Sequence, residues 1–128
     1  MAQNILKVEQ RSFKYALEGL SYALKSQLNF KIQLIIGLIT VLVAAVLGFS
    51  YYDWIILLIL ICLVLSAELT NTVLEKVTDI VQPEIHPEVK IAKDLAAGIV
   101  LLIAVFSVII GILLFYPHIT ALFGSQLR

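Results

Sequence analysis

Charged residues are scarce in this sequence, and their scarcity excludes a soluble globular protein. Only 14% of the 128 residues are charged, 61% are hydrophobic, and the mean hydropathy is +1.02. Soluble domains carry about 25% charged residues. The nine basic residues balance the nine acidic ones, so no excess of positive charge indicates a nucleic-acid partner. The composition predicts a single membrane-embedded domain over residues 1–128.

Cysteine and glycine are also too few or too scattered for two other kinds of structure. Cys62 is the single cysteine, which excludes a disulfide within the chain. The six glycines form neither a Walker-type loop nor the glycine-rich loop of protein kinases. A nucleotide would therefore have to bind without the common phosphate-binding loops.

Three long hydrophobic runs are present instead. Residues 32–52 and 95–116 contain no charge, and residues 54–67 are uncharged before a stretch in which apolar and polar residues mix. A hydrocarbon core of ~30 Å is crossed by about 20 helical residues. In lipid only helices and closed barrels satisfy the backbone, and these runs lack the alternation of barrel strands. The sequence predicts an all-α polytopic membrane protein with spans at about 32–52, 54–80 and 88–117.

Basic residues flank the predicted spans unevenly. Five precede the first span and three lie between the second and the third, whereas the turn at residues 50–53 has none. By the positive-inside rule, the N-terminus and the second connection are cytoplasmic. We therefore expect a multi-pass protein of the inner (cytoplasmic) membrane. In the turn on the other side, we expect Asp53 to be solvated, and His118 to be an interfacial side chain.

A further helix is expected before the first span. Apolar residues recur at helical spacing from Phe13 to Leu28; charged residues precede them at Arg11 and alternate with them at Lys14, Glu18 and Lys25. This pattern predicts an amphipathic helix at about residues 8–29 on the cytoplasmic membrane surface. The pattern fits a simple anchor and a functional element equally well.

Four polar residues follow the apolar part of the second span, in the segment AELTNTVLEKVTD. They are Glu68, Asn71, Glu75 and Asp79. At 100° per residue they fall in a band about 80° wide, so they share one helix face. With a rise of 1.5 Å per residue from Trp54, Glu68 lies roughly 21 Å into the span and Asp79 roughly 38 Å along it. We call these four residues the polar ladder; it runs from hydrocarbon depth to the cytoplasm.

A carboxylate at the depth of Glu68 costs at least ~2.5 kcal/mol on insertion scales, so a function is expected for it. The structural alternative is a polar seam that joins helices by hydrogen bonds, although one Asn or Ser would do this at lower cost. Several oxygens at the water boundary attract a hard cation such as Mg²⁺. The ladder predicts a base that reaches a lipid hydroxyl beside a phosphate site, with Lys90 and Lys93 as cationic groups.

The residues of the ladder and of the next connection resemble one protein family. AELTNTVLEKVTD is similar to the E-x-x-N-[ST]-x-x-E-x-x-x-D run of the prokaryotic integral-membrane diacylglycerol kinase and undecaprenol kinase family, and PEIHPEVKIAKDLAAG is similar to its H-x6-K-D segment. The resemblance extends from SFKYALEGL to the third span. It implies ATP- and Mg²⁺-dependent phosphorylation of a lipid hydroxyl, with undecaprenol preferred to diacylglycerol as the substrate, and a homotrimer with a surface helix and three spans in each chain.

The resemblance also implies roles for individual residues. Glu68 would be the general base, and it would contact the lipid together with Asn71 and Ala97. Glu75 would bind Mg²⁺, with Gln27 as a second ligand. The residues expected to contact the nucleotide or its phosphates are Tyr15, Gln27, Glu75, Glu84, His86, Lys93 and Asp94.

One of these positions departs from the family pattern. Members usually have Glu near the end of the surface helix, in a pattern like E-x-x-F-[RK], whereas the segment QLNFK places Gln27 there. Gln keeps an oxygen ligand but loses the charge, so we expect weaker metal binding.

Two other classes of function are compatible with parts of the pattern. A proton or ion pathway would use a ladder of carboxylates, but the first span and the outer half of the second contain no ionisable group, so the ladder does not cross the membrane. A non-catalytic relative that has lost its metal is favoured by Gln27 alone. Phosphate transfer to a lipid would separate the enzyme from both alternatives.

Overall fold

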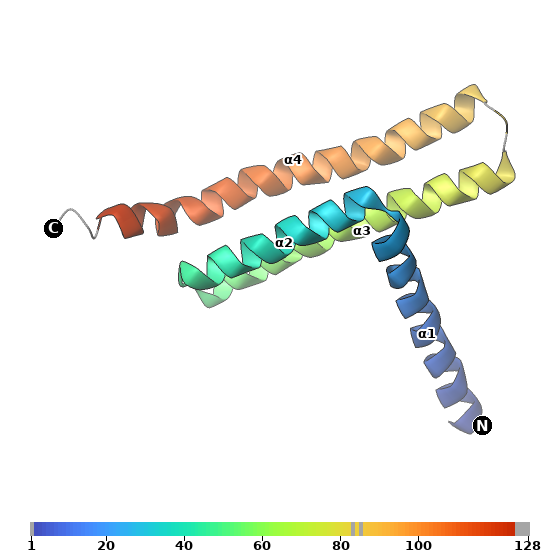
Figure 1. Cartoon of the computed structure of the whole chain (residues 1–128), viewed down its shortest axis with the longest axis horizontal. Helices are drawn as coiled ribbons and strands as arrows, with labels where there is room; N and C mark the ends of the chain where they lie inside the picture. The colour runs from blue at the N-terminus through green and yellow to red at the C-terminus, as the bar shows by residue number, and fades with distance from the viewer. Residues whose placement is uncertain (1, 83, 85, 125–128) are drawn as a thin grey trace.

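The computed structural model of the chain describes residues 2–82, 84 and 86–124, and these residues form four helices (Figure 1). The helices are α1 (Ala2–Ser26), α2 (Leu28–Val46), α3 (Tyr51–Val81) and α4 (Pro87–Gly124). No strand occurs within the described part of the chain. Helices α2, α3 and α4 are each long and apolar enough to cross a membrane, which confirms the predicted all-α fold with three spans.

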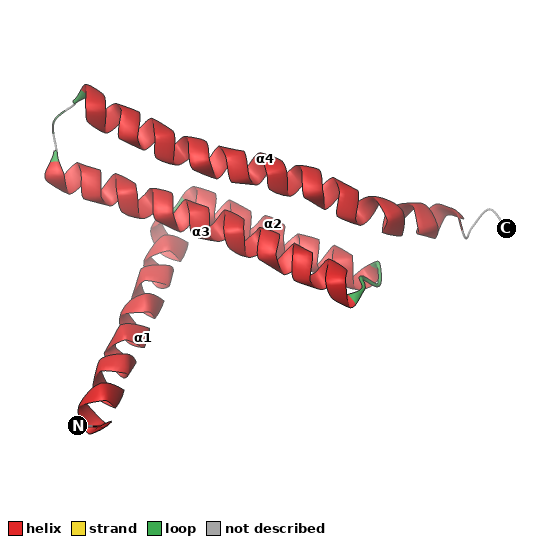
Figure 2. Ribbon diagram, turned by 180° about the vertical axis from the view of Figure 1, so that it is seen from behind, coloured by secondary structure: helices red, strands yellow, loops and turns green. Residues whose placement is uncertain are grey.

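The three spanning helices lie alongside one another, and α1 points away from them (Figures 1 and 2). Helix α3 contacts both α2 and α4. Most apolar side chains of the spans are exposed in the single chain, and a membrane would cover them with lipid or with other helices. The C-terminal part of α3 extends past the start of α2 and runs beside the first turns of α4 (Figure 2).

The chain changes direction between α1 and α2 at one residue. Gln27 takes an extended conformation, with φ −101° and ψ 110°, at the N-cap of α2. Helix α1 therefore ends at Ser26, where the sequence predicted a surface helix to residue 29, and α2 begins at Leu28, where the first span was predicted from residue 32. Ala23 and Phe30 are buried on the two sides of this junction.

Helix α2 ends at Val46, six residues before the predicted end of the first span at residue 52, because the chain turns between α2 and α3. Gly48 has φ +70°, a conformation in which side chains with a Cβ are disfavoured. Its N–H donates to the carbonyl of Ala45, and the N–H of Phe49 donates to the carbonyl of Ala44. This pair of bonds is a Schellman motif, and it ends the helix at a position where hydropathy alone continues it.

Helix α3 begins with a capping box immediately after that turn. The Ser50 hydroxyl accepts from the N–H of Asp53, and the Asp53 carboxylate accepts from the N–H of Ser50. The Oδ2 atom of Asp53 that accepts from Ser50 also lies 3.1 Å from Nε2 of His118 in α4, and each of these two side chains is only 22% exposed. The expectation of a solvated Asp53 is therefore wrong, because Asp53 pairs with His118 across α3 and α4; the interfacial position of His118 stays a prediction.

An aromatic cluster surrounds this pair. The ring of Phe49 is buried and lies 4.5 Å from the ring of His118, 4.6 Å from that of Phe115 and 6.1 Å from that of Trp54, measured between centroids. We call residues 47–54 with Phe115 and His118 the turn end of the bundle. Helices α3 and α4 are also longer than the predicted spans 54–80 and 88–117, since α3 starts at Tyr51 and α4 continues through Pro117 to Gly124.

Candidate functional site

The polar ladder becomes more exposed along α3. Glu68 and Asn71 are buried, with 4% and 9% of their surface exposed, Glu75 is half-buried and Asp79 is exposed. Thr72 is buried beside them, and its hydroxyl donates to the backbone carbonyl of Glu68 at 3.0 Å. Along about three turns of α3, the carboxylates of the ladder therefore change from buried, at Glu68, to exposed, at Asp79.

Glu68 has a partner on another helix. Nε2 of Gln33, in α2, donates to Oε2 of Glu68 at 3.1 Å. Sequence reasoning missed Gln33; the available signal was a single amide in an otherwise apolar run. Because Gln33 Nε2 is held by the carboxylate, the orientation of the whole carboxamide is fixed toward α3.

Two buried oxygens of the site have no hydrogen-bond donor among the described residues. One is Oε1 of Gln33. The other is Oδ1 of Asn71, whose Nδ2 donates to Oε1 of Glu75 at 3.2 Å. A buried polar group without a partner costs about 1–3 kcal/mol. Both acceptors therefore suit a donor that comes from outside the chain, such as a hydroxyl group.

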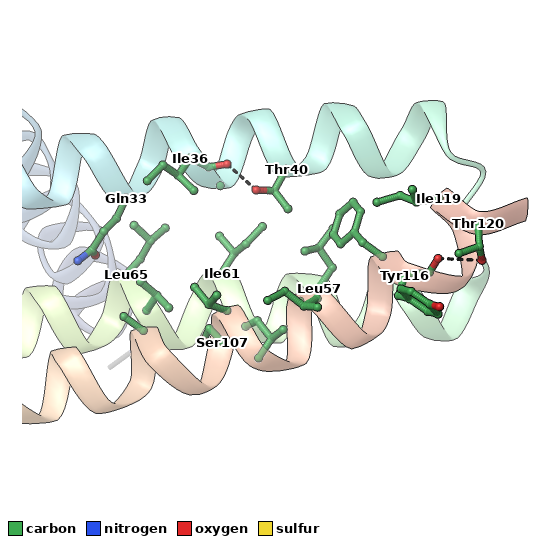
Figure 3. A pocket seen from close by; sticks show the side chains of 18 residues that line it. Gln33, Ile36, Thr40, Leu57, Ile61, Leu65, Ser107, Tyr116, Ile119 and Thr120 are labelled. Carbon is green, nitrogen blue, oxygen red and sulfur yellow. Dashed lines mark hydrogen bonds between the residues drawn. The ribbon is translucent and has the colours of Figure 1, made fainter. Parts of the chain in front are cut away.

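An apolar groove of about 590 Å³ lies between α2, α3 and α4, and Gln33 lines one end of it (Figure 3). Tyr116 and Thr120 of α4 lie near the other end (Figure 3). Gly37 contributes to the wall, and a Cβ at this position would lie 3.2 Å from Cγ2 of Ile61. The absence of a side chain at Gly37 thus allows α2 and α3 to approach closely beside the groove.

A second, smaller cleft of about 230 Å³ lies at the other end of the ladder, between α3 and the start of α4. Lys93 pairs with Asp79 of α3, and Lys90 pairs with Asp94 one turn further along α4. Nδ1 of His86 accepts from the N–H of Glu88 at 3.3 Å and so caps α4. The described residues that line this cleft are Asp79, Gln82, Glu84, His86, Val89, Lys90, Lys93 and Asp94.

The prokaryotic diacylglycerol kinase family model matches residues 14–115 of the chain. The chain belongs to this family. It is 42% identical to the diacylglycerol kinase of Synechocystis sp., over 87% of this chain and 64% of that protein, which is less than two thirds of its length. It is 34% identical to the undecaprenol kinase of Bacillus subtilis, over 85% of this chain and 89% of that one. A diacylglycerol kinase of Helicobacter pylori is 31% identical over 76% of this chain.

Membership of the diacylglycerol kinase family confirms the resemblance seen in the ladder. The names of the relatives contain the two lipids that the sequence predicts as alternative substrates. The matched residues include the ladder, Gln33 and the start of α4. The cleft therefore lies wholly within the matched residues, and the groove lies within them except for the end that Tyr116, Ile119 and Thr120 line.

The structure brings together some of the predicted site residues of this family member. Glu84, His86, Lys93 and Asp94 share the cleft with Asp79, and Asn71 contacts Glu75. Other residues stand apart. Tyr15 is exposed on α1, Ala97 is exposed on α4, and Gln27 forms the junction of α1 and α2. The roles of all of these residues stay predictions.

No cluster of three or more His, Cys, Asp or Glu side chains suited to a metal ion occurs in the described part of the chain. Mg²⁺ in proteins is commonly held by one or two carboxylates, with phosphate and water oxygens completing the octahedron. One oxygen of Glu75 already accepts from Asn71. The half-buried Glu75 therefore fits a cation that arrives with a nucleotide better than one held by the protein alone.

Proposed function

We propose that the chain is a lipid kinase that transfers the γ-phosphoryl group of ATP to the hydroxyl of a membrane lipid. One observation carries this proposal: the buried Glu68 is bonded to Gln33, which lines an apolar groove, and the polar ladder that begins at Glu68 ends at Asp79, which lines a polar cleft. A lipid tail suits the groove, because its lining is almost wholly apolar. A triphosphate that carries a divalent cation suits the cleft, because both lysines and carboxylates line it; they are Lys90, Lys93, Asp79, Glu84 and Asp94.

Glu68 is the general base of the proposed reaction. It removes the proton of the lipid hydroxyl while the lipid oxygen forms a bond to the γ-phosphorus. The bond from that phosphorus to the bridging oxygen of ADP breaks, and ADP leaves with the electron pair. The hydrogen bond from Gln33 orients the carboxylate, and Oε1 of Gln33 or Oδ1 of Asn71 can accept the hydroxyl hydrogen before transfer.

Glu75 and Gln27 are the proposed ligands of Mg²⁺, as the sequence predicts. When bound, the ion would neutralise charge on the transferring phosphate and on the leaving group. Glu75 is the stronger of the two ligands because it is charged and half-buried, and Asn71 holds one of its oxygens in place. Gln27 would supply a neutral oxygen, which is a weaker ligand for a hard cation.

Lys93, Lys90, His86 and Glu84 form the proposed phosphate and nucleotide side of the site. Both lysines are already paired with carboxylates. These pairs are exposed, and exposed pairs are weak, so a triphosphate can exchange them at small cost. The positive end of the α4 helix dipole also favours an anion at this position.

The remaining proposals concern the environment of the chain. We place it in the inner membrane, with its N-terminus and the nucleotide cleft on the cytoplasmic side, where ATP is found, and propose a homotrimer. The exposed apolar faces of the spans, above all that of α4, support an assembly in which other subunits cover part of them. Undecaprenol is proposed as the lipid, with diacylglycerol as the alternative.

The test uses purified protein in detergent with Mg²⁺, ATP labelled at the γ-phosphate, and either undecaprenol or diacylglycerol. We expect label in a lipid, and the ratio of the two rates identifies the substrate. Protein that is folded by circular dichroism and elutes as a single species, but labels neither lipid, would contradict the kinase. Proton flux across liposomes without ATP would instead favour an ion pathway.

A further inference from the structure

Helix α1 leaves the bundle, and a contact between α1 and α3 lies close to the point where it does so. Nζ of Lys76 in α3 lies 5.8 Å from the centroid of the Tyr22 ring in α1. This distance is within the range of an attractive cation–π contact. Figure 2 shows α1 beginning its departure beside α3, while the rest of α1 extends away from the other helices.

The positions of the two residues link the contact to the proposed metal ligands. Tyr22 is in the last turns of α1, five residues before Gln27, and Lys76 directly follows Glu75. Between Tyr22 and Gln27, the hydroxyl of Ser26 donates to the carbonyl of Tyr22 at 2.8 Å. The segment from Tyr22 to Gln27 is therefore locally ordered, and a contact at one end of it constrains the other end.

The electrostatics of the phenol agree with the geometry. The Ser26 hydroxyl, and after it the Lys76 ammonium, hold the pKa of the Tyr22 phenol below its ordinary value. The ring of Tyr22 is 47% exposed, so it can accept the ammonium without leaving the surface. Lys76 thereby has a partner outside its own helix.

The geometry points to Tyr22 and Lys76 as a positioning pair for the nucleotide and metal side of the site. The pair holds the end of α1, with Gln27, against the turn of α3 that carries Glu75. This inference rests on the proposed function, because it gives Gln27 and Glu75 a shared ligand. Neither Tyr22 nor Lys76 is assigned a contact with substrate.

The pair has a second consequence for the charges of the cleft. Asp79 lies three residues after Lys76, and residues at this spacing are neighbours on a helix surface. Asp79 is the partner of Lys93. If the Lys76 ammonium were released from Tyr22, it could compete with Lys93 for Asp79. The contact of Lys76 with Tyr22 therefore also favours the ion pair between Lys93 and Asp79.

The test compares two kinetic quantities in full-length protein with the lipid substrate that the activity assay identifies. Tyr22→Leu removes the ring without changing the charge of the chain, and Lys76→Ala removes the ammonium. We expect each change to raise the Mg²⁺-ATP concentration for half-maximal rate about three-fold, the size of an exposed cation–π contact. The lipid concentration for half-maximal rate should stay as in the wild type, because the groove is not touched.

Conservative and control variants separate positioning from a general effect. Lys76→Arg keeps the cation, so it should retain the wild-type dependence on Mg²⁺-ATP. Tyr22→Phe keeps the ring but removes the phenol oxygen on which Lys76 also acts, so its effect should lie between those of the wild type and Tyr22→Leu. Lys25→Ala removes a cation from the same end of α1 but neither member of the pair, and it should also behave as the wild type. The double change Tyr22→Leu with Lys76→Ala should cost no more than either single change, because both remove one contact.

The outcomes against the inference are specific. A Tyr22→Leu protein with an unchanged dependence on Mg²⁺-ATP, or single changes whose effects multiply in the double variant, would overturn the pair. The same series is to be measured by equilibrium binding of Mg²⁺-ATP, which does not require turnover. If the wild-type protein binds Mg²⁺-ATP but labels no lipid, the proposed function is wrong, and the binding measurements still test the role of Tyr22 and Lys76. If the wild-type protein does not bind Mg²⁺-ATP, both the proposed function and the positioning pair are wrong.

Discussion

The turn end of the bundle pairs its polar side chains, whereas the ladder end leaves two of them without a donor. At the turn end, Ser50 and Asp53 satisfy each other in a capping box, Asp53 also contacts His118, and Phe49 packs on the His118 ring. We call the polar ladder together with Gln33 the ladder end. There, the buried side-chain oxygens of Gln33 and Asn71 lack a hydrogen-bond partner among the described residues. Helix α3 contributes to both ends.

This difference indicates how the chain divides its tasks. Satisfied polar groups and packed rings stabilise a fold, and unsatisfied buried groups reduce its stability. Such groups persist where a ligand completes them. The comparison therefore assigns stability to the turn end and chemistry to the ladder end, and each assignment can be tested by changing one side chain.

The largest expected effect is on the buried carboxylate of the ladder. Glu68→Gln keeps the shape and can still accept from Gln33, but it removes the base. We expect the rate of lipid phosphorylation to fall by at least about 100-fold, the usual contribution of such a group, while the thermal unfolding midpoint stays the same or rises. Initial rates with labelled ATP measure the first quantity. Glu9→Gln, an equivalent change on exposed α1, is the control, and a Glu68→Gln rate above about a tenth of wild type would remove Glu68 from this role.

The turn end should respond in the opposite way. Phe49→Ala removes a buried ring that lies against Phe115 and His118. We expect a loss of about 2 kcal/mol in the free energy of unfolding, below the range for aromatic rings in the centre of a soluble core. Denaturation in detergent followed by circular dichroism measures it. The rate per folded molecule should be unchanged, and a large fall in this rate with normal stability would show that the two ends are coupled.

Gln33 lies at the boundary of the comparison, because it both contacts Glu68 and lines the groove. Gln33→Leu should lower the rate about ten-fold, as expected for the loss of a hydrogen bond to a charged group. Gln33→Asn carries the same amide on a side chain one methylene shorter. This amide should not reach the Glu68 carboxylate, so the rate of Gln33→Asn should be close to that of Gln33→Leu. Thr40→Val, a polar to apolar change further along the groove, is the matched control. Equal rates for Gln33→Leu and the wild type would show that the hydrogen bond from Gln33 does not orient Glu68 for the reaction.

Regular patterns explain how much of this arrangement could be predicted. Uncharged runs gave the three spans, and a spacing of 100° per residue placed Glu68, Asn71 and Glu75 on one face, which the contact between Asn71 and Glu75 supports. Both signals are local. The contact of Gln33 with Glu68 joins residues 35 apart, and that of Asp53 with His118 joins residues 65 apart. Hydrophobic periodicity holds no information on such pairs.

The helix ends were missed for a related reason. The first span was expected to reach residue 52, because apolar residues continue past Val46. The chain turns instead at Gly48, whose positive φ closes the Schellman motif. The direction of α1 was not predictable either, because amphipathicity predicts a surface helix but not the contact between Tyr22 and Lys76 by which it meets α3.

The smallest expected effect tests whether the ladder end extends to the junction of α1 and α2. Gln27→Glu restores the charge that the family pattern has at this position, while Gln10→Glu adds the same charge to α1 far from the junction. If Gln27 reaches the metal, its change should lower the Mg²⁺ concentration for half-maximal rate about five-fold, since two unit charges about 4 Å apart in water interact by about 1 kcal/mol. Gln10→Glu should leave this concentration unaltered. Because Gln27 contributes an oxygen without charge, a requirement for Mg²⁺ that stays the same or rises in Gln27→Glu would place the junction of α1 and α2 outside the metal site.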